Sequence, residues 1–173
     1  LVLSLSKLGL PGVRTGIVIG SEELISAFTN ANTVVSLACG NFGPTIAREL
    51  FKSGEILSLG RDVIKPFYRD RATQAVEWFR QALGNVSYRI HKPEGAIFLW
   101  LWFEGLPITS QELYERLKAR GVLIVPGHNF FPGMADDWQH QQECIRVSYA
   151  QDAESVQKGI HLIADEVIKA FSE

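Results

Sequence analysis

The chain has 173 residues with 17 basic and 19 acidic side chains, so its formal net charge is −2. Hydrophobic residues make up 46% and charged residues 21%, which is typical of a globular domain and excludes a disordered, collagen-like or coiled-coil protein. Because the charge is near neutral and the basic residues are scattered, we expect neither a nucleic-acid partner nor a membrane partner. The length predicts one domain or slightly more.

Apolar runs, cysteines and histidines narrow the class further. The longest apolar stretch, Ala96–Phe103, is far shorter than the roughly 20 residues that a membrane helix needs. Cys39 and Cys144 form no CxxC motif, and the histidines show no HxxxH or HExxH spacing, so no metal site is predicted. We expect two free thiols and a cytoplasmic protein. Since the chain opens inside a predicted strand at Leu1, we also expect it to be a piece of a longer protein.

The first part of the chain alternates short strands with helices, as their bounding glycines, prolines and caps indicate. Ser21 can cap a helix whose first turn carries two glutamates. The elements predicted here are a strand end over residues 1–5, a buried strand over 14–20, a helix from 21, a helix ending near 52 and a long helix over 61–83. Residues 1–60 are predicted to be the end of one domain, and residues 61–84 to be a connecting helix.

The remaining residues, 85–173, are predicted to form a small β-β-α-β-β-α domain. Thr109 and Glu112 match a capping box, and Asp152 can cap the last helix. The predicted strands are 86–91, 97–103, 122–125 and 144–149. Both faces of the strand over 97–103 are apolar, which predicts an interior strand with Phe98, Trp100 and Trp102 in the core.

A lysine near the start of the chain carries the strongest chemical signal. Lys7 follows a strand end, with Ser4 and Ser6 before it and a Gly/Pro-rich loop and Arg14 after it. Lysine amines form Schiff bases with carbonyls, and arginine, serine hydroxyls and loop N–H groups suit a phosphate. Pyridoxal phosphate carries both an aldehyde and a phosphate. A solvated lysine without any such role is the alternative interpretation.

A second signal is the strand Cys144-Ile145-Arg146-Val147-Ser148-Tyr149. Strand alternation places Arg146 on a face with small neighbours, away from the apolar face. Its planar guanidinium suits a carboxylate, although an arginine on an edge strand is often merely solvated. In the loop after residue 125, Phe130 and Phe131 are predicted either to line an apolar pocket or to pack against the fold.

The segment SLSKLGLPGVRTG resembles the lysine segment of the class I, fold-type I pyridoxal-phosphate aminotransferases. The resemblance implies an α/β fold, namely the end of the cofactor-binding large domain followed by a small α+β domain. It implies that Lys7 is the Schiff-base lysine, that Ser4 and Arg14 contact the cofactor phosphate, and that Arg146 binds the substrate carboxylate. It also implies a homodimer, because residues about 30–37 positions after the lysine reach the partner's cofactor in this family. A helix break with structural glycines is the alternative interpretation of those positions.

Longer strings such as HKPEGAIFLWLWF and VPGHNFFPG are similar to one subgroup of the family. That likeness implies transfer of an amino group from valine to pyruvate, giving 3-methyl-2-oxobutanoate and alanine. The family's acidic partner for the pyridine nitrogen and most of its phosphate loop precede the lysine, so we expect these 173 residues alone to be inactive. Two alternatives remain open: a ligand-sensing domain of a transcriptional regulator, and a non-catalytic packing or dimerisation module.

Overall fold

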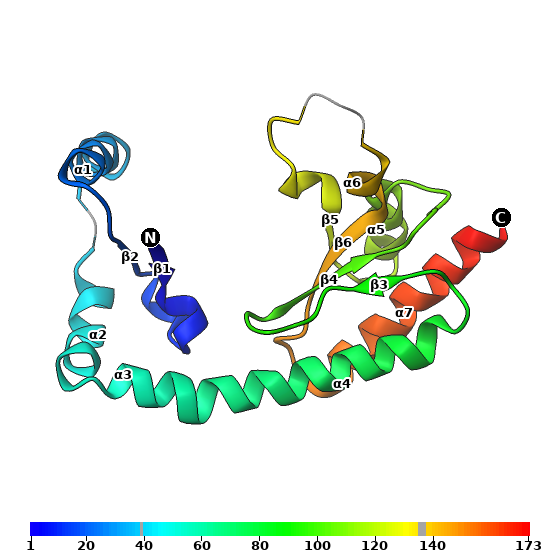
Figure 1. Cartoon of the computed structure of the whole chain (residues 1–173), viewed down its shortest axis with the longest axis horizontal. Coiled ribbons are helices and arrows are strands. Elements are labelled where there is room, and N and C mark those ends of the chain that lie inside the picture. The colour runs from blue at the N-terminus through cyan, green and yellow to red at the C-terminus, as the bar shows by residue number, and fades with distance from the viewer. Residues whose placement is uncertain (39, 135–137) are drawn as a thin grey trace. The chain divides into compact units, whose positions relative to one another are not determined.

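The computed structural model describes residues 1–38, 40–134 and 138–173, so the expected free thiol of Cys39 lies outside it. These residues form two compact units, 1–66 and 67–173, joined within helix α4 (Figure 1). The first unit contains β1 (Val2–Ser4), η1 (Leu5–Leu8), η2 (Pro11–Val13), β2 (Gly16–Val18), α1 (Glu22–Ser36), α2 (Phe42–Ser53), α3 (Glu55–Ser58) and a π-helical turn, η3 (Leu59–Ile64). The second contains most of α4 (Lys65–Leu83), then β3 (Arg89–Ile90), β4 (Phe98–Trp102), α5 (Ser110–Ala119), β5 (Val125–Pro126), η4 (Gly127–Phe130), α6 (Gln139–Glu143), β6 (Cys144–Ser148) and α7 (Ala153–Ser172).

The first unit is built around an antiparallel hairpin of β1 and β2, with Ser4 opposite Gly16. The 3-10 helices η1 and η2 fill the connection, and Gly9 ends η1 in a left-handed conformation at φ 88°. The predicted buried strand over residues 14–20 is wrong in two respects, since β2 is shorter and its residues are exposed or half-buried. In the part of the chain that the structure describes, β2 pairs only with β1. Among these residues the other edge of β2 therefore has no neighbouring strand, which leaves its residues accessible.

Local sequence features determine where helices α1 and α2 of the first unit begin. Ser21 caps α1 as predicted, because its Oγ accepts a hydrogen bond from the Leu24 N–H at 3.4 Å. Helix α2 starts against the loop of the hairpin: a Cβ at Gly43 would collide with the carbonyl oxygen of Val13 and the hydroxyl of Thr15. The missing side chain of Gly43 therefore lets the first turn of α2 pack directly on the loop that carries Arg14.

The second unit contains a four-stranded antiparallel sheet in the order β3-β4-β6-β5. Strands β4 and β6 pair along five residues, with Trp100 opposite Arg146. The outer strands are shorter than predicted. The strand expected over 122–125 pairs only from Val125, because the Val122 N–H donates instead to the carbonyl of Leu117 and closes the end of α5.

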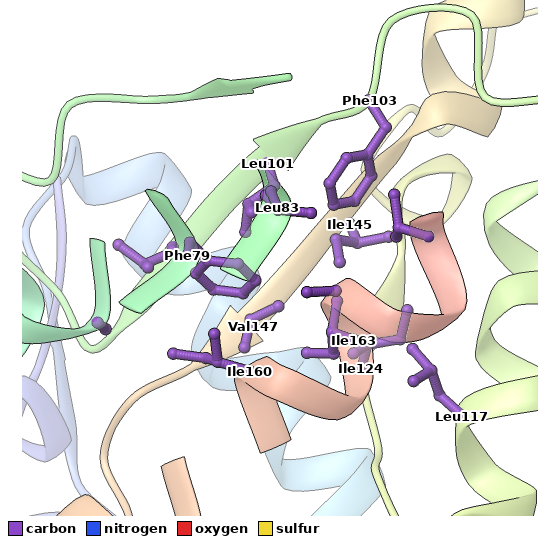
Figure 2. Packing of buried hydrophobic residues seen from close by; sticks show 14 of the residues in the cluster. Phe79, Leu83, Leu101, Phe103, Leu117, Ile124, Ile145, Val147, Ile160 and Ile163 are labelled. Atoms are coloured by element: carbon purple, nitrogen blue, oxygen red, sulfur yellow. The ribbon is translucent and has the colours of Figure 1, made fainter. Parts of the chain in front are cut away.

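One hydrophobic core fills the second unit, and Figure 2 shows its centre. Helix α4 contributes Phe79 and Leu83, and α7 contributes Ile160 and Ile163, all at most 1% exposed. They pack against Leu101, Ile145 and Val147 from the two central strands. Because helices α4, α5 and α7 all supply residues to this cluster, they cover the same face of the sheet.

The placement of Phe98, Trp100 and Trp102 in the core is wrong. Along β4 only Leu99 and Leu101 are buried in the core, whereas the three aromatic residues are half-buried on the opposite face. Successive strand residues point to opposite faces, so the helices can cover only one of the two sets. The aromatic set is instead left to contact the loop after β5 and the short helix α6.

The helix caps of the second unit form at the predicted residues, but of the predicted capping box only the Thr109 half is seen among the described residues. Thr109 Oγ1 accepts the Glu112 N–H at 3.1 Å, and Asp152 Oδ1 accepts the Ser155 N–H at 2.9 Å. Hydrogen bonds from the backbone and the side chain of Ser155 hold the pKa of the Asp152 carboxyl below its usual range. The Glu112 carboxylate pairs with Arg116 at 2.7 Å, so its side chain serves an i, i+4 ion pair on the helix surface.

Candidate active site

The site predicted around Lys7 lies in the connection that joins the two strands of the first unit's hairpin. Lys7 occupies the short helix η1 immediately after β1, and its side chain is exposed. Ser4 caps this helix, with its Oγ accepting the Ser6 N–H at 3.3 Å. Because the hydroxyl oxygen accepts that bond, the hydroxyl proton of Ser4 remains able to bond another acceptor such as a phosphate oxygen.

The return of the chain brings Arg14 to the same end of the hairpin. The Leu5 N–H donates to the carbonyl of Thr15 at 3.1 Å, which fixes the residue after Ser4 beside the residue after Arg14. Arg14 is exposed and holds a left-handed backbone at φ 47° and ψ 40°. Non-glycine residues rarely adopt this conformation, and where they do the site is often functional.

Ser4, Lys7 and Arg14 therefore form one local set of donors. A hydroxyl proton and a guanidinium suit a phosphate, and an exposed primary amine suits an aldehyde. The chemistry of this donor set fits pyridoxal phosphate. Among the residues that the structure describes, no group of three or more His, Cys, Asp or Glu side chains could hold a metal ion.

Arg146 lies in the second unit on β6, on the face of the sheet opposite the helical core. Its guanidinium carbon is 4.2 Å from the centre of the Phe98 ring and 4.7 Å from that of Phe130. Its Nε is buried and has no hydrogen-bond partner. Buried polar groups are nearly always hydrogen-bonded, so this unpartnered guanidinium nitrogen is a candidate donor to an anionic ligand.

An aromatic cluster lies beside this arginine and includes Phe130. The ring of Trp100 meets Phe130 edge-on at 5.1 Å and Phe131 at 6.1 Å. Trp138 stacks on His140 at 4.6 Å, and both rings contact Phe131. The two phenylalanines predicted to line a pocket or to pack thus do different things: Phe130 contacts Arg146, and Phe131 packs within the cluster.

Sequence reasoning missed a buried carboxylate beside this cluster. Glu143 is 5% exposed and accepts hydrogen bonds from Trp102 Nε1 at 2.7 Å, the Gly105 N–H at 3.0 Å and Gln139 Nε2 at 2.8 Å. Gln139 lies on the same helix as Glu143, but Trp102 and Gly105 precede Glu143 by 41 and 38 residues, so no local motif marks its burial. The carboxylate fixes the indole of Trp102 and the turn after β4 relative to α6.

A second contact that local sequence does not indicate ties the turn before β4 to the core. The buried Tyr149 donates from its hydroxyl to the carbonyl of Ala96 at 2.9 Å. Ala96 has a left-handed backbone with φ 64°, which places its carbonyl within reach of the tyrosine. Burial raises the pKa of Tyr149, so the hydroxyl stays protonated and continues to donate.

Cys144 is free, fully buried and 3.5 Å from His140 Nε2. Burial, with a smaller contribution from the nearby Glu143 carboxylate, raises the pKa of this thiol to about 11, although a hydrogen bond with Trp100 opposes the shift. Thiolates, not thiols, are the nucleophilic form, so we assign Cys144 no chemical role.

We expect Cys144 to be alkylated slowly by iodoacetamide in the folded protein at pH 8, where a pKa of about 11 leaves about one thiol in a thousand ionised. The rate should rise about tenfold for each pH unit until the pH approaches that pKa, while the protein stays folded. Mass spectrometry of the peptide that contains Cys144 gives the rate, with the urea-unfolded protein as the control. Equal rates in the folded and unfolded protein at pH 8 would contradict this expectation.

Comparisons with known proteins fit this geometry. The model of the family "Aminotransferase class I and II" matches residues 1–163. Valine–pyruvate aminotransferase of Escherichia coli K12 is 50% identical over 173 residues, which is 100% of this chain and 42% of that protein. An uncharacterized HTH-type transcriptional regulator of Bacillus subtilis is 28% identical over 162 residues, covering 91% of this chain and 31% of the regulator.

A solved structure is similar along nearly the whole chain. The crystal structure of valine-pyruvate aminotransferase AvtA from Salmonella typhimurium has a TM-score of 0.90 and 48% identity, covering 99% of this chain and 44% of that one. The fold is thus the α/β fold of part of a fold-type I transferase, as predicted. The chain belongs to the class I and II aminotransferase family, and it spans less than half the length of these two aminotransferases.

Proposed function

We propose that the protein carrying this chain is a pyridoxal-phosphate-dependent aminotransferase that moves an amino group from valine to pyruvate. The observation that carries the proposal is Arg146, a guanidinium held by two aromatic rings with a buried, unpartnered Nε. Amino-acid and 2-oxo-acid substrates share a carboxylate that this planar fork can bind in a bidentate manner. The choice of valine and pyruvate rests on the 50% identity to the Escherichia coli enzyme.

In the proposed reaction, residues of the chain bind both the cofactor and the substrate. Ser4 and Arg14 bind the cofactor phosphate, and the amine of Lys7 holds the cofactor through its aldehyde. Bound pyridoxal phosphate supplies a carbonyl for the amino group and a ring that withdraws electrons. Arg146 would orient the amino acid by its carboxylate, and the Lys7 amine, once the substrate amine has displaced it from the aldehyde carbon, would remove the α-proton and later return it.

The domain arrangement is part of the same proposal. Residues 1–60 would be the end of the large, cofactor-binding domain, residues 61–84 the connecting helix and residues 85–173 the small domain.

We also propose a homodimer in the cytoplasm. Large apolar side chains are exposed along the first unit, among them Phe28, Val34 and Phe42, and such groups would be covered by the rest of the large domain or by a partner subunit. Sedimentation equilibrium of the full-length protein tests this, since a monomer mass would contradict it. Within the described residues no helix is long and apolar enough to cross a membrane.

Chemical trapping tests the proposed cofactor and lysine directly. The full reading frame that carries this sequence is mixed with pyridoxal phosphate, reduced with borohydride and digested for mass spectrometry. We expect a pyridoxyl adduct on Lys7 and none at that position in Lys7→Ala. An intact protein with no adduct on any lysine would contradict the proposal and favour a packing or dimerisation module.

The likeness to a transcriptional regulator supports a second candidate, a ligand-sensing domain that keeps the cofactor. Turnover separates the two candidates after the adduct has been found. An enzyme given valine and pyruvate produces alanine in many-fold excess over protein, whereas a sensor releases at most one equivalent. Helix-turn-helix residues in the same reading frame would favour the sensor.

A further inference from the structure

We propose that Phe130 is a positioning residue that holds the guanidinium of Arg146 ready for the substrate carboxylate. The inference rests on the proposed function, in which Arg146 binds that carboxylate. Phe130, in the loop after β5, would thus support substrate binding indirectly, through its contact with Arg146.

The two rings at Arg146 come from both neighbours of its strand. Phe98 belongs to β4, on one side of β6, and Phe130 ends η4, which follows β5 on the other side. Their centres lie 4.2 and 4.7 Å from the guanidinium carbon, well within the range of a cation–π contact. The arginine is therefore held between two elements that flank its own strand.

Aromatic rings hold a guanidinium differently from carboxylates. A ring attracts the face of the cation and leaves its N–H edges unbonded, whereas a carboxylate in the protein would occupy the donors that a substrate needs. Within the described residues Arg146 forms no ion pair, and its Nε has no partner. This combination holds the arginine between two rings while its Nε keeps no hydrogen-bond partner.

Phe130 is itself fixed by the sheet. Trp100 lies opposite Arg146 in the β4–β6 register, and its ring meets Phe130 edge-on at 5.1 Å. At the start of η4, Gly127 packs so closely that a Cβ there would lie 2.6 Å from the carbonyl oxygens of Gln141 and Cys144. Phe130 thus reaches the arginine from a turn that is anchored to β6 at one end and to Trp100 at the other.

The test uses Phe130→Leu, Phe130→Tyr and the matched control Phe131→Leu, all in the full-length protein loaded with cofactor. Phe131 is a neighbouring ring that also contacts Trp100, whereas the rings on the guanidinium of Arg146 are those of Phe98 and Phe130. Calorimetry measures the binding of 3-methylbutanoate, a carboxylate with the side chain of valine and no amino group. Steady-state kinetics gives KM and kcat for valine and alanine.

We expect Phe130→Leu to weaken 3-methylbutanoate binding and raise KM about tenfold, the loss of one partly desolvated cation–π contact, with kcat changed less than about twofold. Phe130→Tyr and Phe131→Leu should each stay within about twofold of the wild type. Because valine and alanine share the α-carboxylate, KM should rise by the same factor for both. In an Arg146→Gln background Phe130→Leu should add nothing.

Four other results would overturn either this inference or the proposed function. A rise in KM for valine but not for alanine would make Phe130 a pocket wall and overturn the inference, as would an unchanged KM in Phe130→Leu. An effect that persists in the Arg146→Gln background would also overturn it. If Arg146→Gln leaves 3-methylbutanoate binding unchanged, the carboxylate role in the proposed function fails instead. Circular dichroism checks the fold of each variant, and Phe130→Tyr keeps the ring if Phe130→Leu does not fold.

Discussion

Replacing Lys7 by alanine in the full-length protein is expected to lower kcat with valine and pyruvate about 10²- to 10⁴-fold. The reason is that one amine serves both to hold the cofactor and to move the α-proton. Lys7 is exposed in η1, between the Ser4 cap and Gly9. Removing its side chain should therefore leave the fold intact. The measurement is the initial rate of alanine formation at saturating substrates.

A matched control for Lys7 is available on the same unit. Lys52 is also exposed, lies in the last turn of α2 and has only a long 4.0 Å ion pair with Glu49. Lys52→Ala should therefore keep kcat within about twofold, since exposed ion pairs contribute little to stability. A Lys7→Ala protein that binds cofactor and retains kcat within about tenfold of wild type would remove Lys7 from the proposed acid–base role.

Replacing Arg146 by glutamine is the second large effect, an expected loss of about 100-fold in kcat/KM for valine and for pyruvate alike. Both substrates present a carboxylate to the same fork, so the two losses should be similar. Arg146→Lys should recover only part of the loss, because an ammonium keeps the charge but not the planar pair of donors. Steady-state kinetics in both reaction directions provides the measurement.

Arg89→Gln is the control for a general effect of charge. Arg89 also lies over an aromatic ring, that of Trp102 at 5.9 Å, but it is exposed on the outer strand β3 and pairs with Glu104. We expect kcat/KM of Arg89→Gln to stay within about twofold of wild type. If the Arg89 and Arg146 variants lose activity equally, the carboxylate is not bound specifically at Arg146.

Local sequence patterns predicted the features that depend on neighbouring residues. The caps at Ser21, Thr109 and Asp152 form as expected, because a cap needs only its own side chain and an N–H group three residues further on. The lysine segment was also found locally, since Ser4 and Arg14 lie within seven residues of Lys7. Its role in holding a cofactor remains a prediction.

The strands were harder to delimit from sequence. The segment over 97–103 is apolar on both faces, so its pattern could not show which face the helices cover. The segment over 122–125 is strand-like by composition, yet Val122 closes the end of α5 and only Val125 reaches the sheet. In each case a partner distant in sequence decided between two conformations or faces that the local residues allowed equally.

By itself the sequence determined the residue types and spacings of the candidate chemistry, the helix caps and the existence of a strand that carries Arg146. The tertiary structure alone decided that Phe98 and Trp100 face away from the core, that Phe130 reaches Arg146, and that Glu143 is buried among three donors. The physical reason is that capping and strand alternation act over a few residues, whereas burial and ring contacts join segments that the order of the strands brings together.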